Sequence, residues 1–162
     1  MPERGIHATA KVDPTARVAT SARVGPKVEI GPGAHVMENV YLGPGVRVGR
    51  DAVIGNRTFI DHHSQIDERA RIGRRCRLGY LVRVGNDTHV GDDAILLDCA
   101  MVHENVQLGT HVRVGKDAIV ESGAEVGANA CIGKLQHVAR NTKVAPGTVS
   151  ADISLLRKHG DR

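Results

Sequence analysis

Two histidines and an aspartate stand side by side near the middle of the chain. Asp61, His62 and His63 lie in the segment Ile60–Ile66, which reads IDHHSQI. A neutral imidazole, with an unperturbed pKa of about 6.5, can remove a proton from a hydroxyl or an amine at neutral pH. A neighbouring carboxylate can hold such a ring in one orientation. Asp61, His62 and His63 are therefore candidates for general acid–base chemistry.

The elements that position these side chains repeat every six residues. An aliphatic residue occupies every sixth position from Ile6 to Val144, which makes 24 hexads without an insertion. A second position, four residues after each aliphatic, is small or β-branched in every hexad except the one that holds Gln136. A short fixed period is the sequence signature of a solenoid. The alternation of a large and a small residue suits a narrow interior.

Tight turns are expected between the aliphatic positions. The residue after the aliphatic is glycine in 13 hexads, and the residue two places later is Gly, Asn or Asp in 12. These residue types adopt positive φ at low cost. Three hexads then close one triangular coil, equivalent residues of successive coils stack, and about eight coils form a rod. The sequence predicts one all-β domain over residues 1–149, a parallel β-helix, followed by a short C-terminal helix over residues 150–162 with Ser150 as its cap.

Several residues that break the repeat occupy equivalent positions in successive coils, so they are expected to stack along one edge of the rod. His62 then shares one ridge with Tyr80 and Asp98. Apolar side chains also point outward nearby, and apolar groups on the outside of a rod are usually covered by a partner or a ligand. We expect the following residues around His62 to contact substrate: His63, Tyr80, Asp98, Leu97 and Met101.

His103 is the second candidate for a catalytic base. It occupies a position that is glycine in most hexads, and Glu121 occupies the equivalent position one coil later. A histidine beside a carboxylate can act as a base with its orienting group, or as half of a metal site. We therefore include His103 among the catalytic residues and Glu121 among the substrate-binding ones.

The hexads follow the pattern [LIV]-[G]-x-x-[small]-x, which resembles the hexapeptide-repeat family of left-handed parallel β-helices. The resemblance covers Ile6 to Val149 and implies the handedness, which the period alone does not supply. It also implies a homotrimer with active sites between adjacent subunits. Within it, Ile60–Ile66 is similar to the [IV]-x-H-x-[CS]-x-[IV] segment around the catalytic histidine of bacterial sugar acyltransferases.

The resemblance implies an acyltransferase in which His62 is the general base that deprotonates a hydroxyl or amine, on a sugar or another small molecule. Asp61, or an acidic residue across the subunit interface, would orient His62. The nucleophile then attacks an acyl thioester. The donor, acyl-CoA or acyl-carrier protein, is a co-substrate, and no tightly bound cofactor is implied. The basic run from Arg69 to Arg83 is suited to the phosphates of coenzyme A or to an acidic carrier protein.

Two alternatives belong to other classes. An unbroken repeat also fits a non-catalytic scaffold or assembly subunit, whose regular faces are interaction surfaces. The γ-class carbonic anhydrases share the same fold and bind zinc through histidines. The spacing that corresponds to their H-x₄-H pair ends here at His103 but begins at Asp98, and no third histidine stacks with them. We therefore expect no metal site.

Composition and charge limit the kinds of binding partner and the cellular compartment that we expect. The 162 residues carry a formal net charge of +4, yet only 2% of them are aromatic. Exposed aromatics for base stacking are thus almost absent, which argues against nucleic acid as a partner. The three cysteines lack the spacing of a disulfide framework or a zinc site. With no visible signal peptide or membrane span, we expect a cytoplasmic protein.

Overall fold

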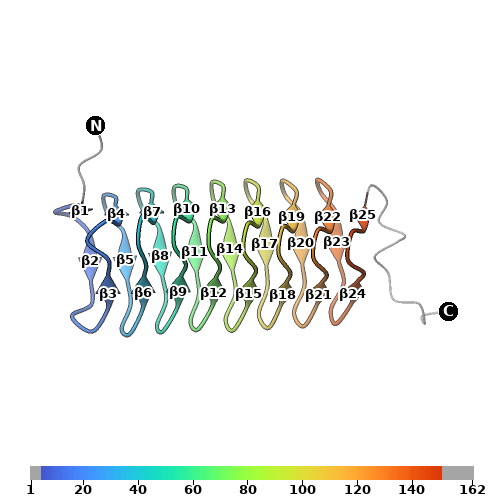
Figure 1. Cartoon of the computed structure of the whole chain (residues 1–162), viewed down its shortest axis with the longest axis horizontal. Helices are drawn as coiled ribbons and strands as arrows, with labels where there is room; N and C mark the ends of the chain where they lie inside the picture. The colour runs from blue at the N-terminus through green and yellow to red at the C-terminus, as the bar shows by residue number, and fades with distance from the viewer. Residues whose placement is uncertain (1–4, 151–162) are drawn as a thin grey trace.

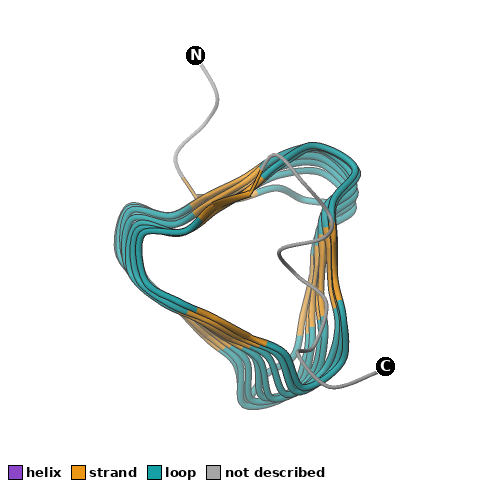
Figure 2. Cartoon of the chain, turned by 90° about the vertical axis from the view of Figure 1, so that its right-hand side faces the viewer, coloured by secondary structure: helices purple, strands orange, loops and turns teal. Residues whose placement is uncertain are grey.

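The computed structural model describes residues 5–150, which form a parallel β-helix of about eight coils (Figure 1). Strands of neighbouring coils pair in parallel, each residue beside its equivalent in the next coil, so that Phe59 lies between Tyr41 and Arg77. Viewed along the rod, the coils superpose as a triangle with a strand on each side (Figure 2). The all-β solenoid predicted from the hexads is confirmed.

The strands form three parallel sheets, one on each side of the triangle. Sheet A consists of β1 (Gly5–Ile6), β4 (Arg23–Val24), β7 (Tyr41–Leu42), β10 (Phe59–Ile60), β13 (Arg77–Leu78), β16 (Ile95–Leu96), β19 (Arg113–Val114), β22 (Cys131–Ile132) and β25 (Val149–Ser150). Sheet B consists of β2 (Lys11–Val12), β5 (Glu29–Ile30), β8 (Arg47–Val48), β11 (Gln65–Ile66), β14 (Arg83–Val84), β17 (Met101–Val102), β20 (Ile119–Val120) and β23 (His137–Val138). Sheet C consists of β3 (Arg17–Val18), β6 (His35–Val36), β9 (Val53–Ile54), β12 (Arg71–Ile72), β15 (His89–Val90), β18 (Gln107–Leu108), β21 (Glu125–Val126) and β24 (Lys143–Val144).

The C-terminal end of the described rod is β25. Ser150, the residue expected to cap a helix, is the second residue of this strand. The predicted helix itself falls on residues 151–162, which lie outside the described residues.

The core is a column of aliphatic side chains along the rod axis. The second residue of each strand points inward, and from Val24 to Val144 every one of these aliphatics is at most 6% exposed. The small residue four positions later is buried as well in most coils, as Ala52 and Ala70 illustrate. Each buried aliphatic contributes roughly 1.5–3 kcal/mol, so stability accumulates along the rod.

The turns between strands form three corners, which we name AB, BC and CA after the sheets that they join. The second turn residue has positive φ in most coils, including all 12 positions where Gly, Asn or Asp predicted it. The same conformation is imposed on other residue types, because the ladder hydrogen bonds on both sides leave the turn no alternative. His63 and Leu81, for example, have φ of 57° and 53°.

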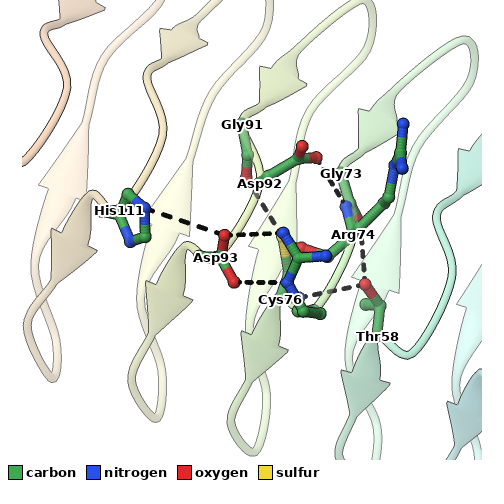
Figure 3. A network of polar contacts seen from close by, with 9 residues as sticks. Thr58, Gly73, Arg74, Cys76, Gly91, Asp92, Asp93 and His111 are labelled. Atoms are coloured by element: carbon green, nitrogen blue, oxygen red, sulfur yellow. Dashed lines mark hydrogen bonds and ion pairs between the residues drawn. The ribbon is translucent and has the colours of Figure 1, made fainter.

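Polar side chains also join neighbouring coils. The buried Thr58 hydroxyl donates to the carbonyl of Gly73 at 2.7 Å and accepts the backbone N–H of Cys76 at 3.2 Å (Figure 3). Burial raises the pKa of the Cys76 thiol to about 11, which keeps it protonated and unreactive at neutral pH. On the surface, the carboxylate of Asp93 lies 3.8 Å from the ring of His111 in the next coil (Figure 3).

Candidate functional site

Corner AB is the irregular corner of the rod. Among the described residues, five of its positive-φ positions hold residues other than Gly, Asn or Asp, against one in corner BC and three in corner CA. The five residues are Lys27, His63, Leu81, Cys99 and Leu135. Such a residue costs roughly 1–2 kcal/mol in the left-handed conformation. Backbone strain of this kind tends to cluster at functional sites.

Asp61 and His62 form a hydrogen-bonded pair at this corner. The Asp61 carboxylate accepts the backbone N–H of His62 at 2.7 Å, and its Oδ1 also contacts the ring Nδ1 of His62. The backbone hydrogen bond from His62 is the main reason why the pKa of Asp61 lies below its ordinary value. Because an ionised carboxylate has no proton to donate, Nδ1 of His62 carries the shared hydrogen. Nε2 is then left with a free lone pair, on a side chain that is 52% exposed.

His63 packs between two neighbouring coils. Its ring lies against Gly45, where a Cβ atom would overlap Nδ1 of the imidazole. On the other side it meets the ring of Tyr80 edge-on, with the centroids 6.1 Å apart and the planes at 77°. The stacking of successive coils predicts that Tyr80 lies beside the two histidines. The same stacking places Gly45 beneath His63, although the Pro44–Gly45 pair indicates only a turn when read alone.

Ser64, the serine of the H-x-S pattern, has a structural role in this chain. Its side chain is fully buried. Its hydroxyl donates to the carbonyl of Gly79 at 2.7 Å and accepts the backbone N–H of Val82 at 3.1 Å. The serine therefore joins the coil of His62 to the next coil and keeps the corner in place.

Tyr80 and Asp98 follow His62 along the ridge, as the stacking predicts. The side-chain Oδ1 of Asp98 accepts the backbone N–H of Tyr80 at 2.9 Å. The same contact recurs at other corners, where the side chain of Asn86 accepts the backbone N–H of Glu68 at 3.0 Å. Asp98 therefore serves at least as a link between coils, while the ring of Tyr80 is exposed beside His63.

His103 and Glu121 lie at the opposite edge of sheet B from His62 and do not pair with each other. Oε1 of Glu121 accepts Nε2–H of His137 at 2.6 Å, and Oε2 accepts the backbone N–H of Arg140 at 3.1 Å. The hydrogen bond from His137 is the main cause of a lowered pKa at Glu121. His103 instead lines a small hollow of about 260 Å³ together with Arg83, Met101 and Glu104.

An exposed apolar strip runs beside the His62 corner. Leu81 and Leu97 on corner AB are 46% and 40% exposed, and Met101 on the adjoining strand is 39% exposed. Ile119 pairs with Met101 in register on the next coil and is half-buried. These apolar side chains, on corner AB and the adjoining sheet B, thus face outward, as their positions in the hexads predict.

Two further observations concern metals and membranes. In the described part of the chain, no three or more His, Cys, Asp or Glu side chains come together as a possible metal site. The same residues include no helix that is long and apolar enough to cross a membrane.

Residues 21–56 match the family described as bacterial transferase hexapeptide (six repeats). The six-residue spacing of the strands in this match continues from β1 to β25. This segment carries the bacterial transferase hexapeptide repeat. A comparison with curated protein sequences finds no match to this hexapeptide-repeat chain.

Several solved structures share the hexapeptide-repeat rod. A UDP-N-acetylglucosamine acyltransferase is similar at a TM-score of 0.73 and 21% identity, over 90% of this chain and 63% of that protein. The UDP-N-acetylglucosamine O-acyltransferase LpxA of Moraxella catarrhalis RH4 is similar at a TM-score of 0.64 and 22% identity, over 86% of this chain and 70% of that protein. The acetyltransferase domain of PglB from Neisseria gonorrhoeae FA1090 is similar at a TM-score of 0.52 and 18% identity, over 86% of this chain and 53% of that domain's chain. The likeness is one of fold and confirms the predicted left-handed β-helix.

Proposed function

We propose that this protein transfers an acyl group from a thioester to a hydroxyl or amine of a small acceptor, with His62 as general base and Asp61 as its orienting residue. The observation that carries the proposal is the contact of the Asp61 carboxylate with Nδ1 of His62. With the Asp61 carboxylate ionised, this contact favours a proton on Nδ1, which would leave Nε2 as the free base. A second hydrogen bond, from the backbone of His62, holds the carboxylate itself.

Each proton and bond in the transfer has a place. Nε2 of His62 takes the proton from the acceptor as its oxygen or nitrogen attacks the thioester carbonyl. The imidazolium formed is stabilised by the charged Asp61 beside it. When the tetrahedral intermediate collapses, the C–S bond breaks and the thiolate takes the proton back from His62. The products are the acylated acceptor and a free thiol, and the protein returns to its initial state.

The acyl chain would lie on the apolar strip of Leu81, Leu97 and Met101. His63 and Tyr80 form the rim between this strip and His62, so they are placed to contact the acceptor. His103 and Glu121 lie across sheet B, where they can contact only a more distant part of a substrate.

A corner of a triangular rod is convex, so a single chain cannot enclose a substrate there. We therefore propose a homotrimer in which a neighbouring subunit supplies the second wall of the site. The exposed side chains Tyr80, Leu81 and Leu97 support this, because an apolar surface at a corner is suited to a partner.

The donor is acyl-CoA or acyl-carrier protein, and such donors place the reaction in the cytoplasm. The PglB acetyltransferase domain has been solved in complex with acetyl coenzyme A; it is similar to this chain at a TM-score of 0.51 and 19% identity, over 88% of this chain and 54% of its own. Lys116, which lies at corner AB and forms no ion pair within residues 5–150, can meet the phosphates of coenzyme A or an acidic carrier.

A thermal-shift titration with acetyl-CoA, a long-chain acyl-CoA and an acyl-carrier protein tests the donor. A ligand present at 100 times its dissociation constant stabilises the folded state by roughly 2.7 kcal/mol, which is readily measured. We expect one of the thioesters to raise the melting temperature, while free coenzyme A or unacylated carrier protein raises it less. If none of the three donors shifts the melting temperature, the proposal is wrong.

A further inference from the structure

The outward face of sheet A has an unusual composition. The first residues of its strands include three arginines, Arg23, Arg77 and Arg113, and not one carboxylate. Within residues 5–150 none of these arginines forms an ion pair. By contrast, Arg47 on sheet B pairs with Glu29 at 3.7 Å. The three arginines of sheet A therefore have no carboxylate partner among the described residues, whereas Arg47 of sheet B has one.

A hollow of about 650 Å³ lies where this face meets corner CA. Tyr41 and Phe59, two of the three aromatic residues of the chain, stand side by side in its wall. Their rings stack with centroids 4.8 Å apart and planes within 11°. The pair presents a rigid apolar surface, and Phe59 is 40% exposed. Arg23 lines the same hollow, on the strand next to Tyr41.

The remaining wall of the hollow is polar and has free hydrogen-bonding capacity. Thr20, Ser21 and Asn39 line it from corner CA. The Ser21 hydroxyl accepts the backbone N–H of Asn39 at 3.0 Å. Within the described residues, the side-chain polar groups of Thr20, Asn39, Arg23 and Tyr41 form no hydrogen bond. Four side chains with unused donors and acceptors thus surround one apolar surface.

We infer that this hollow binds a negatively charged sugar, namely a sugar phosphate. Hydroxyl and amide groups suit the hydroxyls of a sugar ring, and an aromatic surface suits its apolar C–H groups. An unpaired arginine suits a phosphate, because its planar guanidinium can donate two hydrogen bonds to it. A neutral sugar would provide no negative charge for Arg23, and inorganic phosphate would not contact the stacked rings of Tyr41 and Phe59.

The hollow lies at corner CA, whereas His62 lies at corner AB, at the other edge of sheet A. Binding in the hollow depends on its own lining residues and is independent of the proposed acyl transfer.

Isothermal titration calorimetry with N-acetylglucosamine 1-phosphate tests the site without any acyl donor. We expect this probe to bind at least about tenfold more tightly than either N-acetylglucosamine or inorganic phosphate. Arg23→Gln should weaken its binding about tenfold to a hundredfold, the effect of losing a charge-assisted hydrogen bond. Arg113→Gln is the matched control: it removes an unpaired arginine from the same row, more than a Debye length away, and should change the affinity less than about twofold.

Equal affinities for the three probes, or wild-type affinity in Arg23→Gln, would overturn the inference. So would a change in the sedimentation coefficient of Arg23→Gln, since the face would then be a subunit contact. His62→Ala should bind the probe as the wild type does. Probe binding without any thioester turnover would leave this site standing and contradict the proposed transfer; turnover without probe binding would do the reverse.

Discussion

The imidazole of His63 lies in the space that a side chain at Gly45, one coil earlier, would fill. The ring also meets Tyr80 one coil later, so three consecutive coils are in contact at this corner. Gly45 itself has a φ of +72°, which strains any other residue there. His63, the residue next to the proposed base, thus occupies the space left free by Gly45 and packs against the ring of Tyr80.

Gly45→Ala should destabilise the protein more than the same change at a position with equal strain and open space. Gly147 provides that control, because it also has a φ of +72° and no atom lies within 4 Å of a Cβ built there. We expect a loss of about 1 kcal/mol for Gly147→Ala from strain alone. Gly45→Ala should lose roughly 1–3 kcal/mol more, because His63 must move. Urea denaturation measures both, and equal losses would show that the ring placement contributes nothing.

Asp61→Asn should slow acyl transfer without unfolding the corner. The amide can still accept the backbone N–H of His62, but it no longer holds Nδ1–H with a charge or stabilises an imidazolium. We expect the turnover number to fall by roughly 10²–10⁴, with a small change in KM. Asp67, at the equivalent position of corner BC, supplies the control, and Asp67→Asn should keep the rate within about twofold. Equal effects of the two substitutions would remove Asp61 from the mechanism.

Leu81→Asn should make the isolated subunit more stable, although it removes an apolar side chain that the proposed trimer would cover. Leu81 has a φ of 53°, a conformation that asparagine tolerates better than leucine. We expect a gain of about 0.5–1 kcal/mol in the free energy of unfolding. Leu97 is similarly exposed but is not among the residues with positive φ. Leu97→Asn should therefore give no gain, and a gain in both variants would mean that exposure rather than strain is responsible.

The contribution of Glu121 to the stability of the fold should disappear in acid. Its pKa is lowered chiefly by the hydrogen bond from His137, so its carboxylate is more acidic in the folded than in the unfolded chain. A group of this kind stabilises the fold above its unfolded pKa, and this stabilisation is lost as the pH falls through the folded value. The melting temperature of Glu121→Gln should thus lie below that of the wild type at pH 7 and approach it below about pH 4. Glu125→Gln, whose partner Lys143 is 3.7 Å away, should show a smaller gap at pH 7. A gap for Glu121→Gln that persists at pH 3 would contradict this account.

The hexad spacing was sufficient to predict the positions of the strands, the inward aliphatics and the left-handed turns, because each follows from backbone geometry repeated at a fixed interval. It also placed Tyr80 beside the two histidines. It failed to predict that Glu121 bonds with His137 instead of His103. The stacking of coils identifies the neighbours in a column, whereas Glu121 turns its side chain diagonally toward a residue 16 positions later.

The same limit applies to Asp98 and to Ser64. The substrate contact expected for Asp98 stays a prediction, but the hydrogen bond that its carboxylate accepts from the backbone of Tyr80 was not predicted. The hydroxyl of Ser64 likewise joins two coils from inside the rod. Rotamers and local hydrogen bonds determine these contacts, and a one-dimensional period contains no information about either. The apolar strip was predictable because exposure follows directly from the position in the hexad.

Release of free thiol from an acyl thioester, measured for wild type and His62→Ala with a panel of sugar acceptors, tests the central claim most directly. We expect acceptor-dependent thiol release by the wild type and a rate roughly 10²–10⁴ lower for His62→Ala, with the thioester still bound in a thermal-shift assay. His63→Ala should lose much less, because its ring packs at the corner and takes no proton. Thiol release by His62→Ala at the wild-type rate would contradict the role of His62 as base.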